Sequence, residues 1–296
     1  METIKYSVIV PHYNSQQALE ILLESIPDRH DVEIIVVDDN SHQPLNIQKQ
    51  FKNAKLLTKV NDSGVKGAGA ARNIALDIAT GHWAVFADSD DYFTKQAFDS
   101  MDQETADDID VVFFSPTSIY LHNNQLSNRH IEYEKLISDY LNNGDLSIRY
   151  KFYVPWSKVI KMSLIKESNI RFDEVIASND LMFSLRVGVN LRTFSVSKST
   201  VYCVTSGQGS LTKQFNSAVM TSRLLIELKR NEYCCEHGLK EYRNSVIFVL
   251  LKYKRVLNGA MIKRIFNMSL TRKLTVFPIN LSNIIDTKLK KRALSN

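Results

Sequence analysis

Over residues 1–115, short apolar runs rich in Val, Ile and Phe alternate with longer stretches whose apolar residues recur at helical spacing. The short runs show little polar alternation, which is typical of strands covered by helices on both faces. This pattern predicts βαβ units on a parallel sheet. The predicted strands are Tyr6–Val10, Glu33–Val37, Lys55–Val60, Trp83–Ala87 and Ile109–Phe114, and the predicted helices are Gln16–Ser25, Leu45–Phe51, Ala70–Ala79 and Thr94–Met101.

The pattern is less regular over residues 115–188, and it is helical again beyond residue 210. A Ser-Gly-Gln-Gly-Ser stretch at 206–210 has the composition of a linker. We therefore expect an α/β domain over 1–210, with halves at 1–115 and 116–210, followed by a helical region at 211–296. The predicted elements beyond residue 115 are the helices Glu132–Leu141, Lys161–Lys166, Val219–Leu228 and Val246–Leu257 and the strand Val196–Val204.

Composition limits the class of protein. With 296 residues, 44% of them hydrophobic and 23% charged, the chain can bury a full core. Three Cys are too few for a disulfide scaffold or a four-ligand zinc site. The first residues do not form a signal peptide, and no apolar run approaches the roughly 18 residues that span a bilayer. These features predict a cytoplasmic protein that is neither secreted nor membrane-spanning.

The net charge of +5 is divided unevenly along the chain. Residues 211–296 contain 17 Lys/Arg and five Asp/Glu, a net charge of +12, and residues 1–210 carry a net charge of −7. The C-terminal cations are interleaved with apolar residues, which suits a peripheral contact with anionic lipid on the inner face of the cytoplasmic membrane. A solvated helix or an oligomer contact is the alternative. Nucleic acid is disfavoured because no nucleic-acid-binding motif is present.

Three predicted strands end in polar residues. His12–Ser15 follow the first strand, Asp38–Ser41 the second and Asp88–Asp91 the fourth. The carboxyl ends of parallel strands share one edge of a sheet, where ligands bind. Clustered carboxylates repel one another unless a cation neutralises them, so Asp88 and Asp90 are candidate ligands of Mg²⁺ or Mn²⁺, with phosphate oxygens completing the shell. Helix caps and solvated turns are the alternative for each motif taken singly.

A glycine turn, Lys66–Asn73, opens the third predicted helix. Free backbone N–H groups and the helix dipole at a helix start attract anions, so a phosphate is the expected ligand of this turn. A dinucleotide-binding loop would instead follow the first strand and place a third glycine where this chain has Arg72. The structural alternative is that Arg72 pairs with a nearby carboxylate such as Asp88 or Asp90.

In order and spacing, these motifs resemble the inverting family-2 glycosyltransferases with the GT-A fold. The resemblance rests on Ser7–Asn14, Glu33–Ser41, Gly67–Asn73 and Phe86–Asp91. It implies an open mixed sheet flanked by helices, with a C-terminal helical region beyond it. It also implies transfer of a sugar from a nucleotide donor, a UDP-sugar, to a glycan hydroxyl in the synthesis of capsule, O-antigen or exopolysaccharide.

The resemblance assigns a role to each matching residue. Asp90, together with Asp88, is the implied metal ligand for Mn²⁺ or Mg²⁺. His12 and Asn40 depart from the family pattern, where Thr and Gly are frequent. The implied donor-binding residues are Pro11, Tyr13, Asn14, Asp38, Asp39, Lys66, Arg72, Asp88 and Ser89.

The acceptor half is matched by Pro155–Lys158 and Ser178–Phe183. The resemblance puts Asp180 at the position of the catalytic base, and Asn179 stands where a Glu is usual. Asn179 removes a negative charge near the base but leaves the proton acceptor in place. Trp156 and Asn179 are implied acceptor contacts, and a core position is the alternative for Trp156.

Two functions follow from these motifs. The first is a metal-dependent hexosyl- or N-acetylhexosaminyltransferase that acts on a glycan or a lipid-linked glycan. The alternative is a non-catalytic nucleotide- or glycan-binding protein that retains the fold. A sugar nucleotidyltransferase is disfavoured because no glycine-rich, basic phosphate loop lies near the N-terminus.

Overall fold

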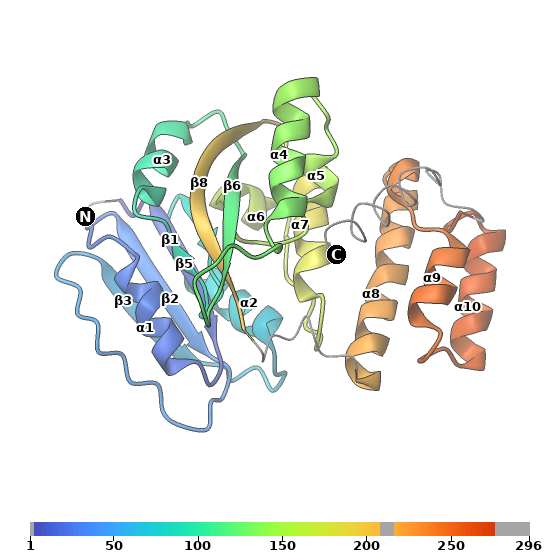
Figure 1. Ribbon diagram of the computed structural model, residues 1–296, viewed down its shortest axis with the longest axis horizontal. Coiled ribbons are helices and arrows are strands. Elements are labelled where there is room, and N and C mark those ends of the chain that lie inside the picture. Colours follow the sequence, from blue (N-terminus) through green and yellow to red (C-terminus); the bar gives the residue numbers. More distant parts are fainter. Residues whose placement is uncertain (1–2, 208–215, 276–296) are drawn as a thin grey trace. The chain divides into compact units, whose positions relative to one another are not determined.

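The structure is a computed structural model that describes residues 3–207 and 216–275. The chain divides into two compact units, Met1–Gln214 and Phe215–Asn296. The domain boundary predicted between residues 210 and 211 lies outside the described residues. Figure 1 shows the first unit as a sheet with helices on both faces and the second as a group of helices.

The first unit contains these elements in chain order: β1 (Tyr6–His12), α1 (Gln16–Glu24), β2 (Val32–Asp38), β3 (Lys55–Val60), α2 (Ala68–Ile78), β4 (Trp83–Phe86), β5 (Tyr92–Phe93), α3 (Ala97–Glu104), β6 (Val111–Tyr120), α4 (Ile131–Asn143), α5 (Ile148–Lys151), β7 (Lys158–Lys161), α6 (Met162–Glu167), α7 (Asn179–Asn190) and β8 (Phe194–Ser206). The second contains α8 (Ser217–Glu236), the 3₁₀ turn η2 (Lys240–Tyr242), α9 (Val246–Tyr253) and α10 (Gly259–Leu270).

The eight strands form one mixed sheet in the order β3-β2-β1-β4-β7-β6-β8-β5. The strands β3, β2, β1 and β4 are parallel, and β7 runs antiparallel between β4 and β6. The pairing of β1 with β2 continues to His12 and Asp38. The carboxyl ends of β1, β2 and β4 therefore meet at one edge, as the sequence pattern predicted.

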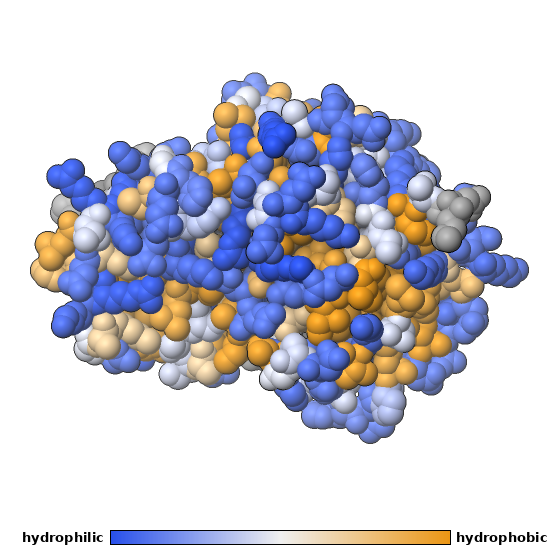
Figure 2. Space-filling view, turned by 180° about the vertical axis from the view of Figure 1, so that it is seen from behind, coloured by the Kyte–Doolittle hydropathy of each residue, from blue (hydrophilic) through white to orange (hydrophobic). Residues whose placement is uncertain are grey.

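Alternate residues of the central strands enter two separate cores. Val8 and Val10 pack with α1 and α3 on one face of the sheet, and Ile9 packs with α2, α4, α6 and α7 on the other. In Figure 1, α1 lies in front of the sheet and α2 lies behind it. The rear view in Figure 2 shows polar side chains over much of the surface, with hydrophobic patches between them. The unbroken apolar runs of the sequence thus correspond to strands that are buried on both sides.

Most of the predicted elements are confirmed, but the helix predicted at Leu45–Phe51 is wrong. This stretch has no regular secondary structure. Its backbone N–H groups donate to side chains of the preceding helix instead: Asn46 N to Gln16 Oε1 at 3.1 Å, and Gln48 N to Glu20 Oε1 at 2.7 Å. Side chains therefore satisfy the donors that a helix would have satisfied.

The second unit consists of helices with well-defined starts. Asn216, Ser245 and Asn258 each accept a hydrogen bond from the backbone N–H three residues later, which begins α8, α9 and α10 respectively. The three helices bury a core that includes Leu224, Val249 and Ile265. α10 is an element that the sequence pattern did not predict. Within the described ranges, every helix is too short or too polar to cross a membrane.

Candidate active site

The ends of β1 and β2 are joined by a buried pair, His12 and Asp38. His12 Nδ1 lies 2.9 Å from Asp38 Oδ1, and Ser41 Oγ donates to the same oxygen at 2.5 Å. Burial favours a higher pKa for Asp38, but the hydrogen bonds from Ser41 and His12 outweigh it and lower the pKa. Asp38 is therefore held as a carboxylate, and His12, which departs from the family pattern, is its partner.

Asp39 organises the loop that precedes α2. Its Oδ1 accepts from Asn61 Nδ2 at 2.6 Å and its Oδ2 accepts from Gly67 N at 2.7 Å. The side chain is buried. Asp39 thereby fixes the glycine turn against the end of β2, and its predicted contact with a nucleoside stays a prediction.

The remaining donor-side residues differ in exposure. Pro11 is buried within β1, whereas Tyr13 and Lys66 are exposed. Asn14 adopts a left-handed backbone conformation (φ 50°), and its Oδ1 accepts from His42 N at 2.8 Å. Ser89 is buried, and its Oγ lies 2.7 Å from Ser15 Oγ. Tyr13, Asn14 and Lys66 are thus the exposed members of this set, and the Tyr13 ring lies edge-on to His42 with ring centres 6.0 Å apart.

The start of α2 lies against the segment that leads into α7. A Cβ on Gly69 would sit 2.4 Å from the carbonyl oxygen of Asp173, so only glycine permits this approach. One turn later, Asn73 Nδ2 donates to Phe172 O at 3.1 Å and Asn73 Oδ1 accepts from Phe172 N at 2.9 Å. These contacts join the two predicted halves of the first unit.

Arg72 connects the two halves at the site itself. Its guanidinium donates to Asp88 Oδ1 at 2.5 Å through Nη2 and to Asn179 Oδ1 at 2.9 Å through Nη1. The side chain is buried, and its guanidinium carbon lies 5.1 Å from the centre of the Phe172 ring. The pairing with Asp88 that was expected as the structural alternative is present. Arg72 also reaches the residue beside the candidate base.

The turn after β4 concentrates three carboxylates. β8 holds this turn: Asp88 N donates to the Tyr202 hydroxyl oxygen at 2.8 Å, and Thr205 N donates to Asp91 Oδ1 at 2.7 Å. Asp91 is buried, whereas Asp90 retains exposed surface although its carboxyl group is partly desolvated. Desolvation, followed by repulsion from Asp88, raises the pKa of both Asp90 and Asp91. The turn therefore carries negative charge that the protein only partly neutralises.

Asp180 lies in the first turn of α7, after Ser178, whose backbone is left-handed (φ 61°). Desolvation raises the pKa of Asp180, the charge of Arg72 opposes this shift, and the charge of Asp88 adds to it. Asp180 therefore lies within electrostatic reach of the donor-side carboxylate. A carboxylate with a raised pKa is suited to accept a proton.

A buried basic side chain, Lys158, also acts on Asp180 electrostatically. Lys158 is 1% exposed, and its Nζ donates to Phe152 O at 2.9 Å and to Ser184 Oγ at 3.2 Å. Burial lowers the pKa of Lys158 to about 7, and the charge of Asp180 opposes this shift. The sequence comparison used Lys158 only as part of a motif and did not single it out.

Trp156 occupies the core. It is 2% exposed and stacks on Tyr202, with ring centres 5.7 Å apart and planes 14° apart. Its edge contacts Tyr133. The geometry matches the core alternative, and no exposed indole face supports the predicted stacking on an acceptor sugar.

Arg129 and Tyr202 are site residues that sequence reasoning missed. Tyr202 accepts the Asp88 N–H, and the charge of Arg129 opposes part of the rise in the pKa values of Asp90 and Asp91. The β5–β8 pairing brings Tyr202 to the turn, and Arg129, in the loop before α4, donates to Thr205 O of β8 at 3.4 Å. Both are long-range features. Neither Arg129 nor Tyr202 belongs to a local sequence motif that points to the site.

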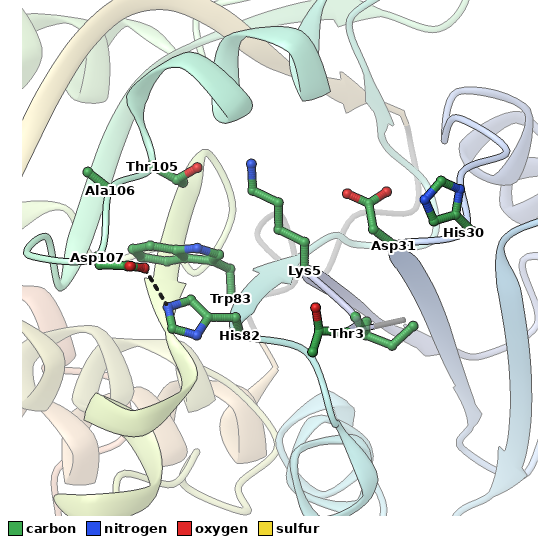
Figure 3. Close-up of a pocket in the computed structure, with 10 residues that line it drawn as sticks. Thr3, Lys5, His30, Asp31, His82, Trp83, Thr105, Ala106 and Asp107 are labelled. Atoms are coloured by element: carbon green, nitrogen blue, oxygen red, sulfur yellow. Dashed lines mark ion pairs between the residues drawn. The ribbon is translucent and has the colours of Figure 1, made fainter. Parts of the chain in front are cut away.

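A separate hollow of about 890 Å³ lies at the opposite edge of the sheet. Figure 3 shows its lining, with Lys5 and Trp83 at the amino ends of their strands and an ion pair between His82 and Asp107 at 3.9 Å. None of the predicted site residues lines it. The candidate active site is therefore the polar carboxyl edge, where ligands of open α/β sheets bind.

Comparison with protein families identifies the chain. The model of "Glycosyl transferase family 2" matches residues 7–168, which include both carboxylate turns and the glycine turn. The chain belongs to glycosyl transferase family 2. The match ends before Asp180, so the candidate base lies outside the matched residues.

The chain is also similar to individual bacterial glycosyltransferases. The poly(ribitol-phosphate) beta-N-acetylglucosaminyltransferase TarS of Staphylococcus aureus strain Mu50 is 28% identical over 236 residues, which cover 77% of this chain and 39% of the relative. A poly(ribitol-phosphate) beta-glucosyltransferase of Bacillus spizizenii is 29% identical over 215 residues, covering 67% and 32% of the two chains. The chain thus spans about a third to two fifths of the length of these relatives.

Solved structures confirm the predicted GT-A fold. The crystal structure of S. aureus TarS 1–349 in complex with UDP-GlcNAc matches with a TM-score of 0.58 and 23% identity, covering 90% of this chain and 72% of that chain. The likeness extends over most of this chain. At this identity it establishes the fold of this family 2 member and not its substrates.

The buried Asp91 generates a prediction about stability. A folded-state pKa above the unfolded value means that wild-type stability falls as pH rises from about 4 through the folded pKa. Asp91→Asn keeps an acceptor for Thr205 N and removes the repulsion by Asp88 and Asp90. We expect a gain of about 1–2 kcal/mol in the free energy of unfolding at neutral pH, which disappears near pH 4.

Urea denaturation at both pH values measures this gain. Asp108→Asn, at an exposed position, is the matched control and should change stability little at either pH. A loss of stability in Asp91→Asn at neutral pH would show that the carboxylate is a net stabilising group.

Proposed function

We propose that the protein is an inverting glycosyltransferase that moves a sugar from a nucleotide donor, a UDP-sugar, to a glycan hydroxyl in cell-surface polysaccharide synthesis. The observation that carries the proposal is the position of Asp180. A candidate proton acceptor with a raised pKa lies beside Asn179, which Arg72 joins to the donor-side Asp88. A binding module does not require a carboxylate of raised pKa at this point.

Two observations support a nucleotide-sugar as the donor: the carboxylates at the end of β2 and the activities named for the relatives. Asp38 and Asp39 are fixed acceptors at the end of β2, suited to the N–H and hydroxyl groups of a nucleoside. The names of two relatives describe transfer of N-acetylglucosamine or glucose to poly(ribitol-phosphate). We extend to this chain only the class, a hexosyl or N-acetylhexosaminyl donor and a glycan or lipid-linked glycan acceptor. The predicted site of action is the cytoplasm, where such donors and the inner membrane face meet.

The carboxylate turn is suited to a divalent cation shared with the substrate. Among the described residues, no group of three or more His, Cys, Asp and Glu side chains is arranged to hold a metal alone. Asp90 is exposed. Asp88, Asp90 and Asp91 repel one another, so a bound cation would stabilise this turn. Mg²⁺ and Mn²⁺ commonly bind through one or two carboxylates plus substrate phosphates. Asp90 and Asp88 would hold such an ion, which would neutralise charge on the leaving diphosphate.

The chemistry at the protein's own residues is a direct displacement. Asp180 accepts the proton of the acceptor hydroxyl as its oxygen bonds to the anomeric carbon, and the bond from that carbon to the diphosphate oxygen breaks with its electron pair. Attack opposite the leaving group inverts the anomeric configuration. Arg72, fixed by Asp88 and Asn179, and the exposed Lys66 supply positive charge on the donor side.

The alternative is a nucleotide- or glycan-binding protein that retains the fold without turnover. Asn179, in place of the usual Glu, is the feature that favours it. Donor hydrolysis without acceptor separates the two functions, because a binding protein would bind UDP and release no sugar.

Replacing Asp180 by Asn removes the proton acceptor and keeps the size of the side chain. We expect the rate of sugar transfer to fall at least about a hundredfold, with UDP affinity preserved. Transfer from labelled UDP-sugars and calorimetry of UDP binding measure the two effects. Asp107→Asn, which alters a carboxylate at the opposite edge, is the control. Wild-type turnover in Asp180→Asn would rule out this base.

Replacing Asp90 by Ala tests the shared metal. We expect the wild type to bind UDP more tightly with Mn²⁺ than without it, and the variant to lose most of this increment. Calorimetry with and without Mn²⁺ gives the comparison, and Asp62→Ala, at an exposed loop position, is the control. An unchanged Mn²⁺ dependence in the variant would contradict the assignment of Asp90.

Asn179→Glu restores the residue that is usual in the family. A carboxylate here repels Asp180 and draws on the charge of Arg72, and both effects raise the pKa of the base. We expect the acid limb of the pH profile of kcat to move upward by about one unit. The neutral control is Asn179→Gln. A profile that is the same in all three proteins would show that Asp180 does not set the acid limb.

A further inference from the structure

One face of α10 exposes a stripe of large apolar side chains. Ile262, Phe266 and Leu270 follow one another at intervals of four residues and are 50%, 61% and 67% exposed. Ile265 and Met268 point to the other side and are buried in the core of the second unit. The helix is therefore amphipathic, and its second apolar face is not used by the core.

Helix α9 repeats this arrangement. Ile247 and Leu251, one turn apart, are 39% and 68% exposed, while Val249 and Tyr253 are buried in the core. Solvent-exposed aliphatic residues on two successive helices are unusual for a small unit whose core is already filled. Figure 2 shows hydrophobic side chains at the surface of the C-terminal helices, at the left of the view.

The same segment is strongly cationic. Residues 242–275 contain eight Lys/Arg and no Asp/Glu. Glu227 and Glu232 on α8 pair with Lys252, Arg264 and Lys273. Among the described residues, no carboxylate pairs with four further cations of this segment, which are Lys254, Arg255, Lys263 and Arg272. Lys263 follows directly after Ile262 of the exposed stripe.

We propose that α9 and α10 form a docking surface for a bilayer of anionic phospholipid, an inference that goes beyond glycosyl transfer itself. Aliphatic and aromatic side chains enter the acyl boundary while neighbouring Lys and Arg meet the headgroups. A second copy of this surface would bring cations against cations. A nucleic acid would neutralise the Lys and Arg charges but would leave the exposed apolar side chains of α9 and α10 in water.

The experiment measures binding of the full chain to vesicles of phosphatidylcholine alone or with about one third phosphatidylglycerol, by co-sedimentation at low salt. We expect binding to the anionic vesicles only. The variant I262S/F266S/L270S and the variant K254E/K263E should each bind them about tenfold more weakly. The matched control is I21S/L146S, which removes exposed aliphatic residues of the first unit and should bind as the wild type does.

Three outcomes would overturn the proposal. The first is equal binding to neutral vesicles, and the second is wild-type binding by both C-terminal variants. The third is a change of mass in light scattering for I262S/F266S/L270S with vesicle binding unchanged, which would identify the stripe as an interface between copies. Retained donor hydrolysis and an unchanged circular dichroism spectrum verify that each variant is folded, so weaker binding by a folded variant supports the proposal.

Discussion

The candidate site depends on one buried cation. Arg72 lies between Asp88, at the end of β4, and Asn179, at the start of α7, and it donates to both. Its place is set by backbone contacts of the same helix, where Gly69 approaches the carbonyl of Asp173. The charge of Asp88 raises the pKa of the desolvated Asp180, and the guanidinium of Arg72 is the largest charge that opposes this rise. Helix α2 thus both joins the two halves of the first unit and supplies the positive charge beside Asp88 and Asp180.

The negative charge of the carboxylates at the site is only partly neutralised by the protein. Asp88 repels Asp90, Asp91 and Asp180, and Arg72 makes a direct hydrogen bond to Asp88 alone among these four described carboxylates. The protein tolerates this cost because β8 fixes the turn with neutral groups, the Tyr202 hydroxyl and the Thr205 N–H. Unneutralised charge that the scaffold holds rigidly is the arrangement expected where a cation and a phosphorylated substrate bind together.

The sequence predicted the sheet and its polar edge because both follow from local patterns. Strands buried on two faces must be continuously apolar, and polar residues after parallel strands must share an edge. The helix predicted at Leu45–Phe51 failed because its donors are taken by Gln16 and Glu20, some 30 residues earlier in the chain. Tyr202 and Arg129 could not be found for a similar reason, since contacts with the distant strand β8 bring them to the turn.

Asn179 illustrates how a departure from a motif can be compatible with the chemistry. A Glu at this position would share Arg72 with Asp88, and the guanidinium would then be less available to offset the charge of Asp180. As a neutral acceptor, Asn179 still orients Arg72 through a 2.9 Å hydrogen bond. The geometry of the bridge is therefore preserved while the charge beside the candidate base is reduced. In this chain the amide serves as a positioning group, and the electrostatic control of Asp180 rests with Arg72, Asp88 and the buried Lys158.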